Sequence, residues 1–178
     1  YKDIGELRTS VLALIKKNRS EQETGNIVPY EEGVEINEDS IFLLSDGSLG
    51  GKGRGLAFIN ALIHNYDFSK ELPDIQIRTP KTFIIGTSEF ELFIKRNKLY
   101  KVIVNETDHA IIKKEFIKGR LSIELTKKLR RLLKSITKPI AIRSSGLFED
   151  SITQPFAGIF ETYLLPNSHS DFEIRLQQ

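Results

Sequence analysis

The chain has 178 residues, of which 39% are hydrophobic, so it is long enough and apolar enough to bury the core of one domain. Its 26 basic and 24 acidic residues leave a net charge of +2, which argues against a dedicated nucleic-acid binder. The absence of cysteine excludes a disulfide framework and a thiolate metal site, and no apolar run reaches membrane-spanning length, so we expect a cytoplasmic protein with no membrane partner.

Residues 3–18 have the pattern of an amphipathic helix. Apolar side chains recur there at alternating spacings of three and four, as on one face of a helix. The simplest interpretation is a helix packed on a neighbouring element, and the alternative is a connector from a preceding domain. The stripe consists of Ile4, Leu7, Val11 and Leu14.

The start of the chain favours the connector. The first residue is Tyr1, and no methionine occurs anywhere, so either the composition is biased or methionines were dropped from the sequence. We therefore expect a piece of a longer protein, with a possible domain fused upstream. On this interpretation residues 1–36 are a linker helix and connector, and residues 37–178 form the domain proper.

A glycine-rich loop follows the short apolar run Ile41–Leu44, which we expect to be a strand. Five glycines fall within the nine residues 47–55, and a helix is expected from about residue 52 to 65. Backbone N–H groups at such a helix start can approach an anion, and Lys52 adds a positive charge. No Ser or Thr follows Lys52, so this is not a Walker A motif, and a structural turn with a solvated lysine is the alternative. The expected inward face of the helix is Leu56, Ile59, Leu62 and Ile63.

The middle of the chain alternates between helical and strand patterns. Residues 75–85 contain Pro80 and read as an edge strand or two short strands. Three helices are then expected, at residues 87–97, 105–118 and 122–136. The first helix should begin at a Thr87 or Ser88 cap and turn Phe90, Phe93 and Ile94 inward. The second should begin at an Asn105 or Thr107 cap and end at Gly119. The third should bury an apolar stripe, which consists of Leu125, Leu129, Leu132, Leu133 and Ile136. Interleaved elements of this kind predict an α/β or α+β fold, a mixed sheet flanked by helices.

Two further features have ordinary explanations. The basic run on the last of these helices fits a solvated far face, because no companion patch or aromatic interleaving accompanies it. The three histidines have no metal-ligand spacing, so we expect no metal site. The basic residues are Lys127, Lys128, Arg130, Arg131 and Lys134, and the histidines are His64, His109 and His169.

Residues 140–166 read as strand, charged turn, loop and strand. The apolar run Ile140–Ile142 delivers Arg143, Ser144 and Ser145, and a second apolar run ends at Leu165. A cation and successive backbone donors at the end of a buried strand are a common way to hold phosphate. This segment makes phosphate or nucleotide binding the leading hypothesis. Its loop contains Glu149 and Asp150 and a small-residue corner, Phe156-Ala157-Gly158.

Two motifs, in the same order, resemble the phosphoenolpyruvate synthase and pyruvate phosphate dikinase family. Gly50-Gly51-Lys52-Gly53 is similar to that family's G-G-K-G motif. Residues 143–162 resemble its R-S-S, E-D, F-A-G and E-T series. These are Arg143-Ser144-Ser145, Glu149-Asp150, Phe156-Ala157-Gly158 and Glu161-Thr162.

The resemblance implies the N-terminal half of an ATP-grasp domain. Lys52 and Arg143 would contact the ATP phosphates, with Arg143 in the catalytic role. Ala157 and Gly158 would belong to the loop that covers the phosphates, and Thr162 would lie near the nucleotide. The family's Mg²⁺-binding carboxylates would lie beyond Gln178, so this portion alone would not catalyse a reaction.

The family's chemistry leaves two hypotheses for the intact protein. In the first, ATP phosphorylates a histidine elsewhere in the protein, and the phosphoryl group passes to pyruvate or another acceptor. In the second, the module is degenerate and senses nucleotide or serves as a scaffold in a signalling fusion. Ile159 and Phe160 favour the second, because they stand where the family has paired glutamines.

Overall fold

The computed structural model describes residues 6, 8, 10–11, 25–37, 40–146 and 160–178. Glu6, Arg8, Ser10 and Val11 are helical, and the rest of the helix expected at 3–18 lies outside the described residues. No helix in the described part of the chain is long and apolar enough to cross a membrane. The fold mixes helices with small β-sheets, which confirms the α+β expectation at the level of fold class.

A parallel three-stranded sheet forms the centre of the structure. Its strands are β1 (Ile27–Pro29), β2 (Ile41–Ser45) and β3 (Thr82–Ile85), in the order β1-β2-β3. The expected strand at Ile41–Leu44 is confirmed as β2, and β3 lies at an edge of the sheet, as the nearby Pro80 suggests. The sequence pattern did not predict β1, which pairs with β2 over only three residues.

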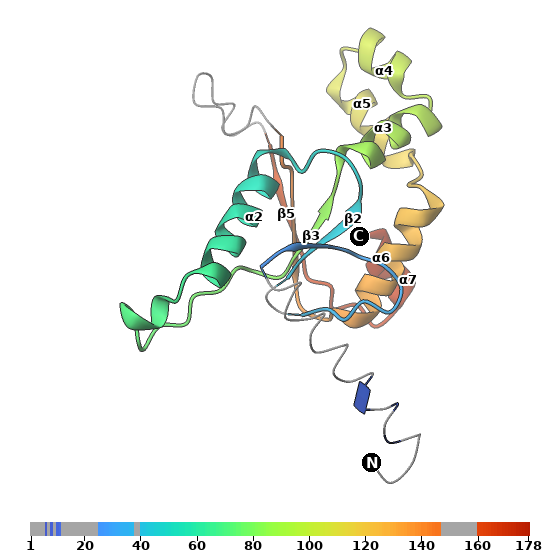
Figure 1. Ribbon diagram of the computed structural model, residues 1–178. Helices are drawn as coiled ribbons and strands as arrows, with labels where there is room; N and C mark the ends of the chain where they lie inside the picture. The colour runs from blue at the N-terminus through green and yellow to red at the C-terminus, as the bar shows by residue number, and fades with distance from the viewer. Residues whose placement is uncertain (1–5, 7, 9, 12–24, 38–39, 147–159) are drawn as a thin grey trace, which may run out of the picture.

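Helices lie on both sides of this sheet. Figure 1 shows α2 (Gly50–Asn65) on one side and α6 (Ile123–Ser135) on the other. Helix α2 links β2 to the parallel strand β3, with the 3-10 turn η1 (Phe68–Lys70) between them. Parallel neighbours require a crossover of this kind, so β2, α2 and β3 form a βαβ unit.

The main core lies between the sheet and α6. Phe42 and Leu44 project from β2 toward Leu125 and Leu132 of α6, as the two-residue period of a strand requires. Phe42 stacks on Phe83 of β3, with ring centroids 5.1 Å apart. Ser122 caps α6 by accepting a hydrogen bond from the amide of Leu125. Four residues of the expected stripe are confirmed as the packing face: Leu125 and Leu132 are buried in the core, and Leu129 and Ile136 pack against it.

Helix α2 packs differently from its expected apolar face. Ile59 and Leu62 are exposed, whereas Gly50, Gly53 and Asn60 are buried. The buried side chain of Asn60 accepts a hydrogen bond from the Thr79 hydroxyl at 2.6 Å, which ties the helix to the segment before β3. The expectation is wrong for Ile59 and Leu62, whereas Leu56 and Ile63 are half-buried. The residues that the helix buries most completely are Gly50, Gly53 and Asn60, which carry no large apolar side chain.

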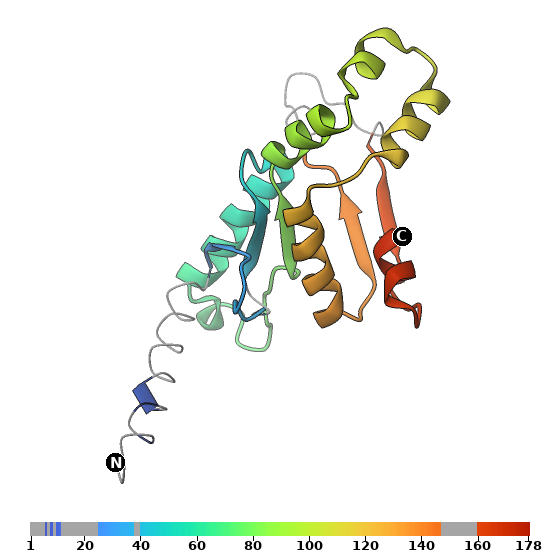
Figure 2. The same cartoon turned by 90° about the vertical axis from the view of Figure 1, so that its right-hand side faces the viewer.

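Three helices project from the sheet as an arm, at the top of Figure 2. They are α3 (Thr87–Arg96), α4 (Tyr100–Asn105) and α5 (His109–Lys118). The cap of α3 is Gly86 and that of α5 is Asp108, in place of the expected side-chain caps at 87 or 88 and at 105 or 107. Phe90 is 59% exposed, so its expected inward position is wrong, whereas Phe93 packs against Phe116. Gly119 ends α5 as predicted.

The C-terminal segment forms a separate hairpin and a short helix. Strands β4 (Ile140–Arg143) and β5 (Thr162–Leu165) pair antiparallel, and α7 (Phe172–Gln177) follows. The expectation of a buried strand is wrong here, because Ala141, Ile142 and Arg143 are exposed in this structure. Among the described strands the two-stranded sheet makes no ladder with β3, and most residues of β4 and β5 are exposed.

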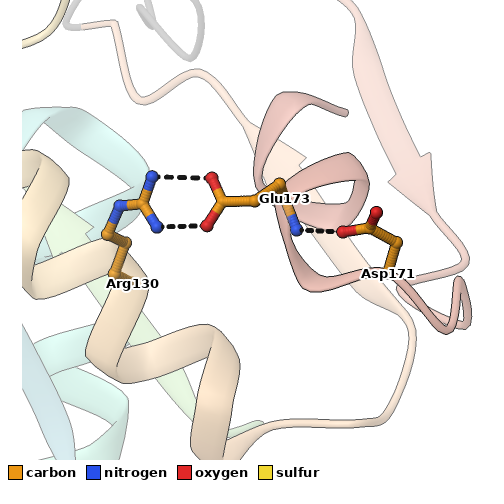
Figure 3. Close-up of polar contacts among 3 residues, drawn as sticks. All are labelled: Arg130, Asp171 and Glu173. Atoms are coloured by element: carbon orange, nitrogen blue, oxygen red, sulfur yellow. Dashed lines mark hydrogen bonds and ion pairs between the residues drawn. The ribbon is translucent and has the colours of Figure 1, made fainter.

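The basic run on α6 is more than a solvated face. Arg130 binds Glu173 of α7 through two parallel hydrogen bonds of 2.5 and 2.7 Å, and Asp171 caps α7 (Figure 3). Lys128 donates to the carbonyl of Leu44 at 2.9 Å. Sequence periodicity places the basic run away from the apolar stripe, but it reveals neither that α7 packs on Arg130 nor that Lys128 reaches the sheet.

The aromatic core makes a direct stability prediction. Phe42 is 1% exposed and Phe58 is 69% exposed. We expect Phe42→Ala to lower the free energy of unfolding by about 3–5 kcal/mol, through lost burial and the cavity it leaves. The matched Phe58→Ala should change it by less than about 0.5 kcal/mol. Urea unfolding followed by circular dichroism measures both, and equal losses would contradict the assigned core.

The Arg130–Glu173 pair makes a prediction about pH. The hydrogen bond from Arg130 lowers the pKa of Glu173 below its ordinary value of 4.5. A lowered carboxyl pKa stabilises the folded protein above pH 4.5, and this stabilisation is lost as the pH falls through the folded-state pKa. Melting curves across this range should therefore show a smaller acid-induced fall for Glu173→Gln than for the parent protein.

A second variant checks the cause of that effect. Arg130→Met should give the same pH dependence as Glu173→Gln, and the double variant should differ little from either single one. Because the pair is exposed, high salt should weaken the difference. An unchanged acid profile in both single variants would show that the pair contributes nothing to stability.

Candidate functional site

The loop between β2 and α2 is held against the start of α3. The Ser48 amide donates to the Thr87 hydroxyl at 2.9 Å, and the Thr87 amide donates to the Ser48 carbonyl at 3.2 Å. Gly47 has a φ of +107°, and a Cβ there would lie 2.6 Å from the Ser88 amide nitrogen. Only glycine fits such a position, so the glycine-rich loop has a fixed path into α2.

The turn after β4 packs directly on the first turn of α2. The Ser145 hydroxyl accepts a hydrogen bond from the Gly53 amide at 2.9 Å and donates one to the Leu49 carbonyl at 2.7 Å. Gly50 has a φ of +71°, and a Cβ there would lie 1.4 Å from the Ser145 carbonyl oxygen. Two motifs separated by more than 90 positions in the sequence are thus in contact in the structure.

These contacts change the interpretation of the glycine-rich loop. Of the amides that open α2, that of Gly50 donates to the Ser48 hydroxyl and that of Gly53 to the Ser145 hydroxyl. We expected the backbone amides at the start of this helix to approach an anion. That expectation is incomplete, because two of these amides already donate to serine hydroxyls of the protein. At Gly50 and Gly53 the absence of a side chain admits the turn after β4.

Lys52, Arg143 and Thr162 are brought to the same region. Lys52 lies in the first turn of α2, next to Gly53, and its Nζ atom is shielded from solvent. Arg143 is exposed and lies two residues before Ser145, and its partner across the β4–β5 ladder is Thr162. Cross-strand partners project to the same face of a sheet, so Arg143 and Thr162 share one face of the hairpin. Ala157 and Gly158 lie outside the described residues.

Glu161 makes a structural hydrogen bond. Its carboxylate accepts from the hydroxyl of Tyr163, and this bond raises the pKa of the tyrosine. Tyr163 is one residue from Thr162 and therefore projects to the other face of the hairpin. The sequence leaves two interpretations for Glu149, Asp150 and Glu161, which could orient the cations Lys52 and Arg143 or make structural hydrogen bonds. For Glu161 this contact favours the structural interpretation, and Glu149 and Asp150 lie outside the described residues.

A hollow on the α6 side of the sheet has the wrong charge for a polyphosphate. The charged residues in its lining are four acids and one lysine, and the lysine already donates to the Leu44 carbonyl. Repulsion from the acids would disfavour a triphosphate there. Over the ranges that the structure describes, no group of three or more His, Cys, Asp or Glu side chains is placed to hold a metal ion. The acids are Glu31, Asp46, Glu89 and Glu124, and the lysine is Lys128.

The packing of Ser145 on α2 predicts opposite effects for two glycines of that helix. Gly50→Ala should lower the free energy of unfolding by at least about 2 kcal/mol, because it strains a positive φ and collides with the Ser145 carbonyl. Gly55 has ordinary helical geometry and open space around it, so Gly55→Ala should raise it by about 0.5–1 kcal/mol. Chemical unfolding measures both, and a Gly50→Ala variant as stable as Gly55→Ala would disprove the contact.

Comparison with known proteins found a matching family, whose model covers both segments of this candidate site. The family described as the pyruvate phosphate dikinase AMP/ATP-binding domain matches residues 46–175. The match includes both the loop that opens α2 and the whole β4–β5 hairpin. No curated protein and no solved structure matches the chain significantly.

Proposed function

The chain belongs to the pyruvate phosphate dikinase family through its AMP/ATP-binding domain, and on this premise we propose that the triphosphate of ATP binds where the β4–β5 hairpin meets the start of α2. The observation that carries the proposal is the contact of Ser145 with Leu49, Gly50 and Gly53. It places the two motifs that contain Lys52 and Arg143 against each other.

Each named side chain has a role in this proposal. Arg143 presents a planar guanidinium that can hold two phosphate oxygens at once, and its exposure leaves it accessible. Lys52 supplies a point charge once its flexible side chain swings outward from its shielded position. Thr162 shares the Arg143 face of the hairpin and offers a hydroxyl to the nucleotide. Ala157 and Gly158 would belong to the loop over the phosphates.

The chemistry assigned to these residues is positioning and charge neutralisation. Phosphoryl transfer requires little covalent participation by the protein, so cations fixed around the phosphates supply much of the catalysis. In the intact protein, ATP would phosphorylate a histidine outside this portion, and pyruvate or another acceptor would receive the phosphoryl group. Residues 37–178 would form the N-terminal half of an ATP-grasp domain. The described residues do not fit a Mg²⁺ site, so no step of this proposal depends on one.

A second candidate function is nucleotide sensing without turnover. Phe160 favours it, because its ring lies 3.4 Å from the position that a Cβ on Gly146 would take. An apolar ring therefore packs beside the turn that follows Arg143, where the family has a polar amide. A sensor would bind ATP with the same residues and would release no phosphate, so an assay of ATP consumption distinguishes the two functions.

Substitution of the two cations tests the proposed site. In the full-length protein, Lys52→Ala and Arg143→Ala should each weaken ATP binding by about tenfold or more, because each removes a charge paired with phosphate. Isothermal titration calorimetry with a non-hydrolysable ATP analogue measures this. Lys70→Ala and Arg96→Ala remove exposed cations of η1 and α3 and should leave the affinity unchanged.

Two outcomes would count against the site. If all four variants bind the analogue as the parent does, the nucleotide binds elsewhere. If the parent protein binds no adenine nucleotide at all, nucleotide binding by this chain is itself wrong.

A further inference from the structure

Ser145 belongs to a motif whose serines have no part in the proposed phosphate contacts. Its hydroxyl is occupied on both sides, as acceptor from the Gly53 amide and donor to the Leu49 carbonyl. A hydroxyl held in this way is unsuited to act as a nucleophile, since its proton and a lone pair are both committed. Its role must therefore lie in what these two bonds hold together.

The two bonds join the cation-bearing segments of the site. Leu49 and Gly53 flank Lys52 at the start of α2, and Ser145 follows Arg143 by two residues. The Ser145 carbonyl group occupies the space that a side chain at position 50 would need. Strand β4 is largely exposed and, among the described strands, pairs with β5 and with no strand of the parallel sheet, so the bonds of Ser145 tie the Arg143 segment directly to α2.

We propose that Ser145 is a positioning residue for nucleotide binding, which aligns Arg143 with the Lys52 turn so that both cations meet one polyphosphate. The proposal rests on the proposed function, since it concerns the same site. A bidentate guanidinium contact is sensitive to displacements of less than about 1 Å, so loss of the anchor should weaken phosphate binding even while the fold remains intact.

The experiment compares ligands with and without phosphates in the full-length protein. We expect Ser145→Ala to weaken binding of a non-hydrolysable ATP analogue by about five- to tenfold, a size expected for two lost hydrogen bonds. Binding of adenosine, which has no phosphate, should stay within about twofold. Ser135→Ala, which removes a hydroxyl bonded to the Leu132 carbonyl within α6, should change neither affinity.

A double-variant cycle separates positioning from general support of the fold. If Ser145 acts by aligning the two cations, then Lys52→Ala with Ser145→Ala should bind the analogue no more than about twofold worse than Lys52→Ala alone. Ser145→Cys provides a second route if Ser145→Ala does not fold, because it keeps a side chain of similar shape with a much weaker hydrogen-bonding group. It should show the same selective loss for the phosphate-bearing ligand.

Each result has a distinct meaning. Equal loss of adenosine and analogue binding, or full additivity with Lys52→Ala, would overturn the positioning role while leaving the site intact. Unchanged analogue binding in both the alanine and the cysteine variants would also overturn it. Failure of the parent to bind the analogue would remove the proposed function and this inference together, whereas a loss in Lys52→Ala with none in Ser145→Ala would remove the inference alone.

Discussion

The packing of Ser145 on the first turn of α2 is the contact on which the candidate site depends. It closes a loop of more than 90 residues through two hydrogen bonds and one close backbone approach. Without it, Lys52 and Arg143 would belong to separate parts of the chain. The glycines of the loop make this approach possible, because a side chain at Gly50 would occupy the place of the Ser145 carbonyl. This backbone contact brings the segment that contains Arg143 against the segment that contains Lys52.

The opposite end of the hairpin is fixed by a different set of contacts. The amide of the buried Asn167 donates to the carbonyls of Ile136 and Lys138, which ties the end of β5 to the end of α6. Helix α7 then docks on the same helix through the bidentate Arg130–Glu173 pair. Helix α6 thus has two packing faces, an apolar one on the sheet and a basic one on α7. The hairpin that carries Arg143 is anchored at both ends, while its faces remain largely exposed.

Sequence patterns predicted the positions of helices and strands better than they predicted which faces of those elements are buried. Strand β2 followed from a short apolar run and helix α6 from its helical periodicity, and both patterns depend on neighbouring residues. The side-chain caps expected for α3 and α5 were wrong. Two short motifs correctly indicated the family, since two motifs in the family's order are far more specific than either one alone. The exposure of Ile59, Leu62 and Phe90 did not follow, because periodicity reports that a face is apolar and not whether another element covers it. The Ser145–Gly50 contact could not be predicted either, since it depends on a backbone approach between segments that are distant in the sequence.

The roles of Lys52, Arg143 and Thr162 stay predictions, and those of Ala157 and Gly158 concern residues outside the described structure.

The most direct test of the central claim is an experimental structure of the full-length protein with a non-hydrolysable ATP analogue. Our account predicts the triphosphate at the junction of the β4–β5 hairpin and α2, with phosphate oxygens about 2.7–2.9 Å from the Arg143 guanidinium and the Lys52 amine. It also predicts that the Ser145 hydroxyl keeps its bonds to Leu49 and Gly53. A triphosphate bound elsewhere, such as in the hollow beside Glu31, Asp46 and Lys128, would contradict the account.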